Sequence, residues 1–212
     1  MTGRIISIRS TIFPERGIHI AWSFWLLLAA ALLVSPPRVI AAVLLAAAMH
    51  EGGHLAQLAV FGVPVEGLRL GASGAVIYAR GARRLPYGRE LLVTLAGPAV
   101  NLLAAPLLAM LSARAAWEWG YLLAGAHALL GVYNLLPILP LDGGQALWLL
   151  IAWRRGPSAG DAASAVIGLL CALALAAFGA YVTFSYGGAL FLLASLGLLV
   201  SQIRLAKTAL SV

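Results

Sequence analysis

The stretch Val39–Val60 reads VIAAVLLAAAMHEGGHLAQLAV, and it places His50, Glu51 and His54 inside a run apolar enough to lie within a lipid bilayer. Because His50 and His54 stand at positions i and i+4, a helix projects both imidazoles from one face, where both can reach one Zn²⁺. Glu51 lies beside them and can take a proton from a water that the metal activates. The stretch therefore predicts a hydrolytic zinc site at membrane depth.

The composition indicates the class of protein. Of the 212 residues, 62% are hydrophobic and 10% are charged, and the mean hydropathy is +0.97. A soluble domain of this length would expose a very large apolar surface, so the sequence predicts a polytopic membrane protein. The net charge of +7 comes from basic residues that flank apolar segments. This placement favours membrane orientation over nucleic-acid binding.

Apolar segments of roughly 20 residues predict about six transmembrane helices. Their predicted ranges are 18–34, 38–60, 88–111, 117–153 (broken near 137–143), 161–183 and 188–205. The intervening stretch, about 61–87, is rich in glycine, proline and arginine, and two β-prone runs in it flank the turn Gly71-Ala72-Ser73-Gly74. We expect an all-α membrane fold with a short β-hairpin or re-entrant segment after the second helix, forming a single domain over residues 1–212.

The basic residues also predict the orientation of the helices. If the N-terminus is cytoplasmic, only Arg38 and Arg114 fall on the outer side. The other twelve fall on the cytoplasmic side: Arg4, Arg9, Arg16, Arg69, Arg80, Arg83, Arg84, Arg89, Arg154, Arg155, Arg204 and Lys207. This bias predicts a multi-pass membrane protein with both termini on the cytoplasmic side. The compact architecture and the Ala/Arg-rich composition indicate a prokaryotic cytoplasmic membrane. The two histidines would then lie about 9–15 Å below the cytoplasmic end of their helix.

Zinc needs a third protein ligand and an open position for water. Asp142 is the strongest candidate because Pro137 and Pro140 precede it and Gly143-Gly144 follows, so the helix should be interrupted there and the carboxylate can turn inward. The alternative is that Asp142 caps the helix over 145–153. The remaining candidates, most of them near predicted membrane interfaces, are His19, Glu66, Glu90, Glu118, His127 and Asp161.

Three segments resemble the site-2 protease family of intramembrane zinc metalloproteases, in the order of the family's motifs. His50-Glu51-Gly52-Gly53-His54 resembles its His-Glu-x-x-His helix, and Gly97-Pro98-Ala99-Val100-Asn101 resembles its Gly-Pro-x-x-Asn helix. The segment from Asn134 to Gly143 resembles its Asn-x-x-Pro-x-x-x-x-Asp-Gly segment. The resemblance covers about residues 20–153. Since there is no room for a PDZ domain after the second helix, it is to the compact branch that includes the sporulation sigma-factor processing protease.

The resemblance implies an enzyme, a zinc metalloendopeptidase that hydrolyses a peptide bond in or near a transmembrane segment, close to the cytoplasmic side. His50, His54 and Asp142 would bind one Zn²⁺. Glu51 would deprotonate a water for attack on the peptide carbonyl and then pass the proton to the leaving amine. The implied partners are a membrane-embedded or membrane-tethered protein substrate and the lipid bilayer.

Two buried amides, Asn101 and Asn134, are the further catalytic candidates. The resemblance implies that they polarise the scissile carbonyl or hold the substrate backbone. Interhelical hydrogen bonding is the alternative for each. His127 lies roughly 15 Å by helical rise from the break at Pro137, so we interpret it as a structural polar residue of the bundle.

Gly52 and Gly53 each lower helix propensity by about 1 kcal/mol relative to alanine. Their small size indicates close approach of a neighbouring helix or of a substrate strand. The predicted hairpin likewise has two interpretations: its open edge could pair with an unwound substrate segment, or it is a surface loop whose arginines fix the topology.

Two other functions stay open from the sequence. The residues His50, His54 and Asp142 could form the transit site of a metal-binding membrane transporter, or the chain could be a catalytically inactive membrane scaffold. A substitution at Glu51 separates these possibilities, because transport would survive the loss of a general base whereas hydrolysis would not.

Overall fold

The computed structural model describes residues 17–71, 74–80, 85–186 and 189–210. They form two compact units, residues 1–133 and 134–212, which are described separately. Part of the expected hairpin turn and several of the basic residues used for the orientation lie outside the described residues: Ala72, Ser73, Arg4, Arg9, Arg16, Arg83 and Arg84.

The first unit contains four helices: α1 (Trp22–Val34), α2 (Pro37–Val60), α3 (Tyr87–Ala115) and α4 (Glu118–Asn134), the last residue of which belongs to the second unit. Pro37 occupies the first turn of α2, where its fixed φ suits a helix start and its missing N–H leaves no partner unsatisfied. Ala116 caps the C-terminus of α3: it adopts the left-handed conformation with φ 51° and donates its N–H to the carbonyl of Ser112. The short connection that follows turns the chain directly into α4.

A three-stranded sheet accompanies these helices, in the order β1-β2-β3. β2 (Val65–Gly71) and β3 (Gly74–Ala79) are antiparallel, so the hairpin expected after the second helix is present. β1 (Gly17–Ile20) pairs in parallel with β2 and was not expected. The predicted start of the first helix at residue 18 was wrong. The observed helix α1 begins at Trp22, because the backbone of residues 17–20 is hydrogen-bonded to β2.

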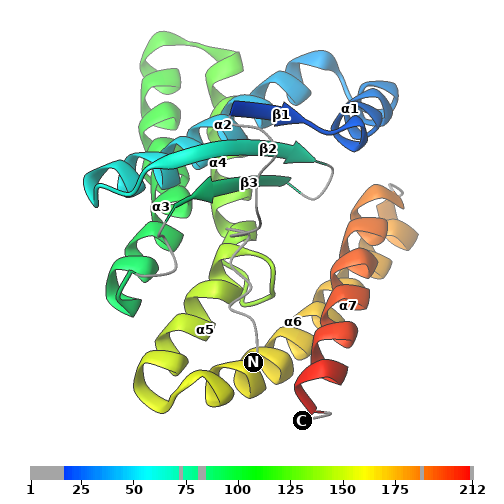
Figure 1. The fold of residues 1–212 in the computed structure, drawn as a ribbon. Coiled ribbons are helices and arrows are strands. Elements are labelled where there is room, and N and C mark those ends of the chain that lie inside the picture. The colour runs from blue at the N-terminus through cyan, green and yellow to red at the C-terminus, as the bar shows by residue number, and fades with distance from the viewer. Residues whose placement is uncertain (1–16, 72–73, 81–84, 187–188, 211–212) are drawn as a thin grey trace. The chain divides into compact units, whose positions relative to one another are not determined.

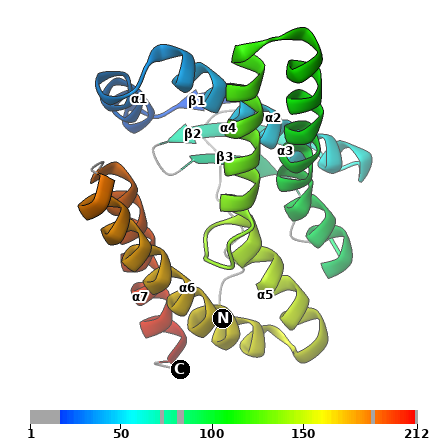
Figure 2. The same cartoon turned by 180° about the vertical axis from the view of Figure 1, so that it is seen from behind.

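One face of the sheet packs on the helices of the same unit. Leu58 of α2, Ile77 of β3 and Val93 of α3 are buried together. Leu55, Phe61, Val63, Leu68, Ala79 and Leu85 surround them. The strands lie across these helices in the views from both sides (Figures 1 and 2). The sheet therefore covers the end of α2 and the beginning of α3, close in sequence to the predicted metal motif.

The second unit consists of α5 (Asp142–Arg155), α6 (Pro157–Tyr186) and α7 (Ala189–Leu210), with α6 packed against both of the others. Residues 135–141, which include Pro137 and Pro140, are not helical and lead into α5. We call them the proline loop. Two backbone hydrogen bonds form turns within this loop. The Ile138 N–H donates to the Leu136 carbonyl at 2.7 Å, and the Leu141 N–H donates to the Ile138 carbonyl at 2.8 Å.

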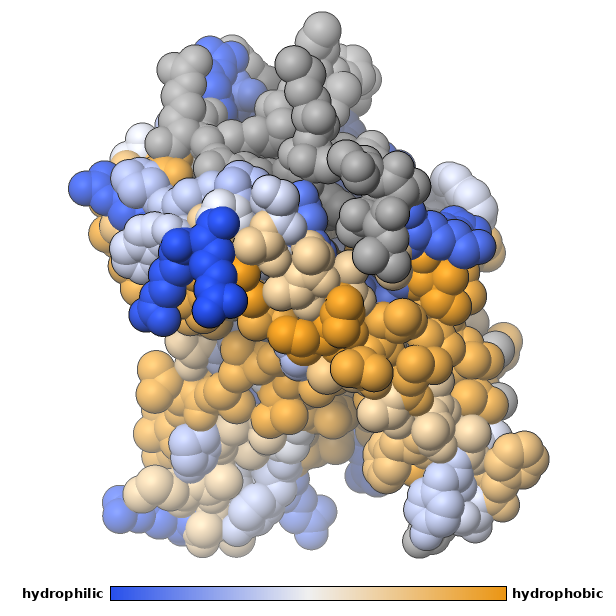
Figure 3. Space-filling view, turned by 90° about the horizontal axis from the view of Figure 1, so that it is seen from below, coloured by the Kyte–Doolittle hydropathy of each residue, from blue (hydrophilic) through white to orange (hydrophobic). Residues whose placement is uncertain are grey.

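Within the part of the chain that the structure describes, three helices are long and apolar enough to cross a membrane: α2, α3 and α6, whose most apolar 18-residue segments have mean hydropathies of 1.5, 1.9 and 2.3. α1 is apolar but has only 13 residues. Large side chains stand exposed, for example Leu33 at 87% and Phe184 at 88%, and apolar residues cover much of the surface in Figure 3. These features support a membrane protein, while the count of six transmembrane helices stays a prediction.

Candidate metal centre

The two histidines of the His-Glu-x-x-His motif meet on the buried side of α2. His50 and His54 are 5% and 8% exposed, and their Nε2 atoms lie 3.2 Å apart. Two nitrogens bound to one tetrahedral zinc at about 2.0–2.1 Å would be roughly 3.3 Å apart, as that bond length and angle require. The two imidazoles therefore converge at the spacing that a shared metal ion needs.

The outer nitrogen of His54 is held by the backbone of α3. Its Nδ1 lies 2.8 Å from the carbonyl oxygen of Val93, which can only accept, so Nδ1 carries the proton and donates. Nε2 then keeps its lone pair and is the metal-binding atom. Nearby, Pro98 has no N–H to give to the carbonyl of Thr94, and this interrupts the hydrogen-bond ladder of α3 one residue from Val93.

Gly97 makes room for both imidazole rings. A Cβ atom at this position would lie 2.8 Å from Nε2 of His50 and 2.7 Å from Cε1 of His54. Real Cβ atoms do not approach other atoms so closely, so any side chain here would displace the rings. The first glycine of the Gly-Pro-x-x-Asn segment therefore has a steric role at the metal centre, which the sequence alone did not assign.

Gly53 and Gly52 differ in their surroundings. A Cβ on Gly53 would lie 2.7 Å from the carbonyl oxygen of Ala96 and 3.0 Å from a methyl carbon of Val100. A Cβ on Gly52 would meet nothing within 4 Å. The close approach expected from these two glycines is thus present at Gly53, where α2 touches α3.

Asn101 of α3 lies between two histidines from different helices. Its amide nitrogen is 3.3 Å from Nδ1 of His50 in α2, and its amide oxygen is 3.0 Å from Nδ1 of His127 in α4. Asn101 and His127 are both 0% exposed. Interhelical hydrogen bonding, one of the two interpretations of Asn101, is therefore what the structure shows, and His127 is a direct neighbour of this asparagine.

Glu51 follows His50 on α2 and is half-buried. The first unit thus contains both histidines, Glu51 and Asn101, while Asn134 and Asp142 belong to the second unit. Asn134 is the last residue of α4 and is half-buried.

Asp142 is the first residue of α5, where a carboxylate is favoured by the helix dipole. The capping position is Leu141, so Asp142 does not cap this helix as the alternative interpretation required. The next two residues lack side chains, and this allows the proline loop to lie close to them. A Cβ on Gly143 would lie 2.6 Å from the Leu136 carbonyl oxygen, and a Cβ on Gly144 would lie 2.7 Å from the Ile138 carbonyl oxygen. The proline loop therefore packs directly on the first turn of α5.

Gln202 of α7 reaches the same loop. Its side-chain amide donates a hydrogen bond to the backbone carbonyl of Leu139, and the residue is fully buried. Gly168 of α6 allows this contact, because a Cβ there would fall against the Gln202 side chain. Sequence reasoning missed Gln202, although a glutamine in an apolar helix was a signal for it.

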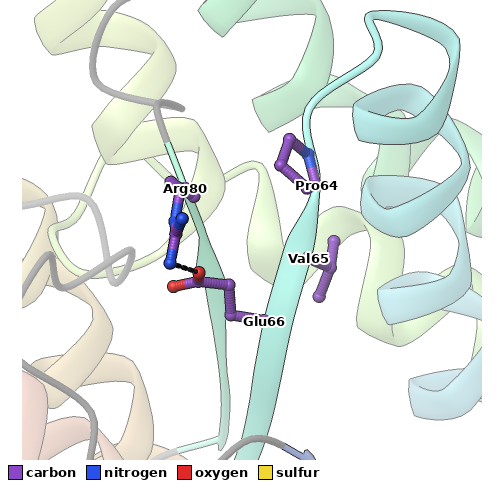
Figure 4. A pocket seen from close by; sticks show the side chains of 4 residues that line it. All are labelled: Pro64, Val65, Glu66 and Arg80. Carbon is purple, nitrogen blue, oxygen red and sulfur yellow. Dashed lines mark ion pairs between the residues drawn. The ribbon is translucent and has the colours of Figure 1, made fainter.

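Several weaker ligand candidates are used elsewhere. Glu66 forms an ion pair with Arg80 at 2.6 Å, at a shallow hollow that Pro64 and Val65 also line (Figure 4). Asp161 accepts a hydrogen bond of 2.8 Å from the indole N–H of Trp148. Three further candidates lie in other elements: His19 in β1, Glu90 in the first turn of α3 and Glu118 in the first turn of α4.

Comparisons with known proteins bear on the fold. No protein-family model matches the chain, and no curated protein matches it. Among solved structures, the Site-2 Protease from Methanocaldococcus jannaschii matches with a TM-score of 0.67 and 22% sequence identity, covering 92% of this chain and 94% of that chain. This likeness extends over nearly the whole length of both proteins, and it agrees with the resemblance that the three motifs indicate. The chain therefore has the fold of a site-2 protease.

Proposed function

We propose that the protein is an intramembrane zinc endopeptidase of the site-2 protease family, which cuts a membrane protein in or near a transmembrane segment close to the cytoplasmic side. The observation that carries this proposal is the convergence of the two Nε2 atoms of the His-Glu-x-x-His motif, 3.2 Å apart on a helix apolar enough to cross a membrane. Ionisable side chains at such depth are costly and mark functional sites by default.

The residues suit zinc. His50, His54 and Asp142 each offer one ligand atom, two imidazole nitrogens and a carboxylate oxygen, which is a donor set of catalytic zinc sites. With the proton of His54 on Nδ1, its Nε2 carries the lone pair that would bind the metal. A bound Zn²⁺ supplies Lewis-acid activation of a water and of the peptide carbonyl.

The chain's own groups supply the proton transfers and the positioning. Glu51 takes the proton of the attacking water and delivers it to the amine that leaves when the peptide bond breaks. Asn134, at the end of α4, donates its amide N–H to the scissile carbonyl or to the substrate backbone. The buried surroundings of the histidines exclude bulk water and so strengthen these polar interactions.

The test is a comparison of wild type with Glu51→Gln, purified in detergent, measuring zinc content and cleavage of a model transmembrane substrate. Wild type should hold one zinc per chain and cleave, and Glu51→Gln should keep the zinc while cleavage falls by about 10²–10⁴-fold, the usual contribution of a general base. Glu118→Gln is the matched control, because Glu118 is exposed at the start of α4.

The rival functions give different results in the same preparation. A transporter would move zinc across vesicles equally well with Glu51→Gln, and an inactive scaffold would hold zinc without cleaving any of several substrates. Full cleavage by Glu51→Gln, or a wild-type protein that binds no zinc, would contradict the proposed protease.

A further inference from the structure

Three buried polar side chains, one from each of three helices, form a continuous hydrogen-bonded chain that ends at the metal motif. His127 of α4 contacts Asn101 of α3 at 3.0 Å, and Asn101 contacts Nδ1 of His50 in α2 at 3.3 Å. Because both contacts involve Nδ1 atoms, Nε2 of His50 stays directed at Nε2 of His54. These hydrogen bonds therefore reach His50 at Nδ1, the ring nitrogen that does not face His54.

The tautomer of His50, the orientation of the Asn101 amide and the tautomer of His127 depend on one another. His50 can bind a metal through Nε2 only if its proton is on Nδ1, and this Nδ1–H must then donate to an oxygen. The oxygen of the Asn101 amide must therefore face His50, and its NH₂ group must face His127. In the structure the Asn101 nitrogen faces Nδ1 of His50 and its oxygen faces Nδ1 of His127, so metal binding requires the amide group to turn end for end. The two ends of a carboxamide have nearly the same shape, so this turn keeps both contacts. Nδ1 of His127 then accepts from Asn101, and its proton is on Nε2.

His127 itself has a single side-chain bond among the described residues. Its contact with Asn101 is that bond, and Nε2 has no hydrogen-bond partner there. A buried polar atom without a partner costs about 1–3 kcal/mol, so an apolar side chain would fill the same space more favourably. A histidine at this position is best explained by its effect on Asn101.

We propose that Asn101 and His127 are positioning residues that hold His50 in the tautomer in which Nε2 binds the metal. His127 accepts from the NH₂ group of Asn101, which turns the Asn101 oxygen toward His50, where it accepts the Nδ1 proton. His54 needs no such positioning residue, because its Nδ1 faces the Val93 carbonyl, which can only accept a hydrogen bond and so fixes the proton on Nδ1. The proposal rests on the proposed zinc site, and it places Asn101 behind a ligand rather than against the substrate.

The experiment measures the affinity of each purified protein for zinc by competition with a chelator. Asn101→Leu removes the acceptor and should weaken binding by about 10–100-fold, the usual effect of losing such a partner. Asn101→Asp keeps an oxygen toward Nδ1 of His50 and should bind zinc as tightly as wild type or tighter. His127→Leu leaves Asn101 in place but no longer orients it, so its affinity should lie between those of wild type and Asn101→Leu.

The control is Ser112→Ala, which removes a different buried polar group of α3, one that bonds within its own helix to the Leu108 carbonyl. Its zinc affinity should equal that of wild type. Wild-type affinity in Asn101→Leu, or equal losses in Asn101→Leu and Asn101→Asp, would overturn the proposal.

Activity at saturating zinc gives the second measurement. If Asn101 acts through His50, cleavage by Asn101→Leu should recover as zinc is raised, whereas a direct contact with the scissile carbonyl predicts a loss of kcat that zinc does not restore. The second result would overturn the positioning role. If wild type bound no zinc at all, the zinc-protease proposal would fail first, so the two failures are distinguishable.

Discussion

The side-chain amide of Gln202, in the second half of α7, donates a hydrogen bond to the backbone carbonyl of Leu139 in the proline loop. The two residues are 63 positions apart in the sequence. Asp142 follows this loop directly, so α7 supports the segment that carries the proposed carboxylate ligand. α7 therefore has a defined structural role in the second unit.

Replacing this glutamine should loosen the proline loop. Gln202→Leu leaves the buried Leu139 carbonyl without its donor, at a cost of about 1–3 kcal/mol. Amide hydrogen exchange over residues 135–141 should become faster, while exchange in the first unit stays unchanged. Ser195→Ala is the control in the same helix, because its hydroxyl bonds to the neighbouring Leu192 carbonyl. Unchanged exchange in the loop would show that Gln202 does not hold it.

Gly97→Ala should abolish zinc binding. The added Cβ would overlap both imidazole rings, which are already packed between α2 and α3, so the rings must move from the positions at which their Nε2 atoms converge. Metal content of the purified protein measures the effect. Gly125→Ala is the matched control, since a Cβ there meets nothing within 4 Å. Stoichiometric zinc in Gly97→Ala would contradict the steric role of this glycine.

Asp142→Asn should lower zinc retention, because an amide oxygen is a much weaker zinc ligand than a carboxylate. Asp161→Asn makes the same change within the second unit but keeps an acceptor for the Trp148 indole, so it should retain the metal. Dialysis against a chelator, followed by metal analysis, compares the two variants. Equal retention by both would remove Asp142 from the proposed ligand set.

Val76→Pro tests substrate binding at the sheet. β3 is an edge strand among the strands that the structure describes, since the order is β1-β2-β3. A proline there removes a backbone donor, so cleavage should fall at unchanged zinc content if substrate pairs with this edge. Val76 is half-buried, whereas its neighbour Ile77 belongs to the core with Leu58 and Val93. Normal cleavage by Val76→Pro would exclude pairing at this strand.

The sequence predicted local features well and distant pairings poorly. The i, i+4 spacing placed His50 and His54 on one buried face, and turn-forming residues predicted the hairpin of β2 and β3. Gly17–Ile20 looked like the start of an apolar helix. It is a strand because it pairs with β2 about 50 residues later, a tertiary contact that local propensity does not encode.

The interpretation of His127 as a structural polar residue of the bundle agrees with its complete burial and its hydrogen bond to Asn101. Distance along α4 from Pro137 did not predict this neighbour, which belongs to the adjacent helix. Helical rise measures separation along one helix and says nothing about contacts between helices. Asn101 had two interpretations from the sequence, and its two histidine neighbours now favour the one in which it bonds between helices.

The two histidines of one motif differ in how they are held. A backbone carbonyl, that of Val93, fixes His54, and a side chain, that of Asn101, contacts His50. Mutation of residue 93 cannot delete its carbonyl, so evolution is free to exchange apolar residues there as long as they fill the core. A single codon change at residue 101, in contrast, reaches the metal centre. Substitutions of Val93, which supports His54, should therefore be tolerated better than substitutions of Asn101, which contacts His50.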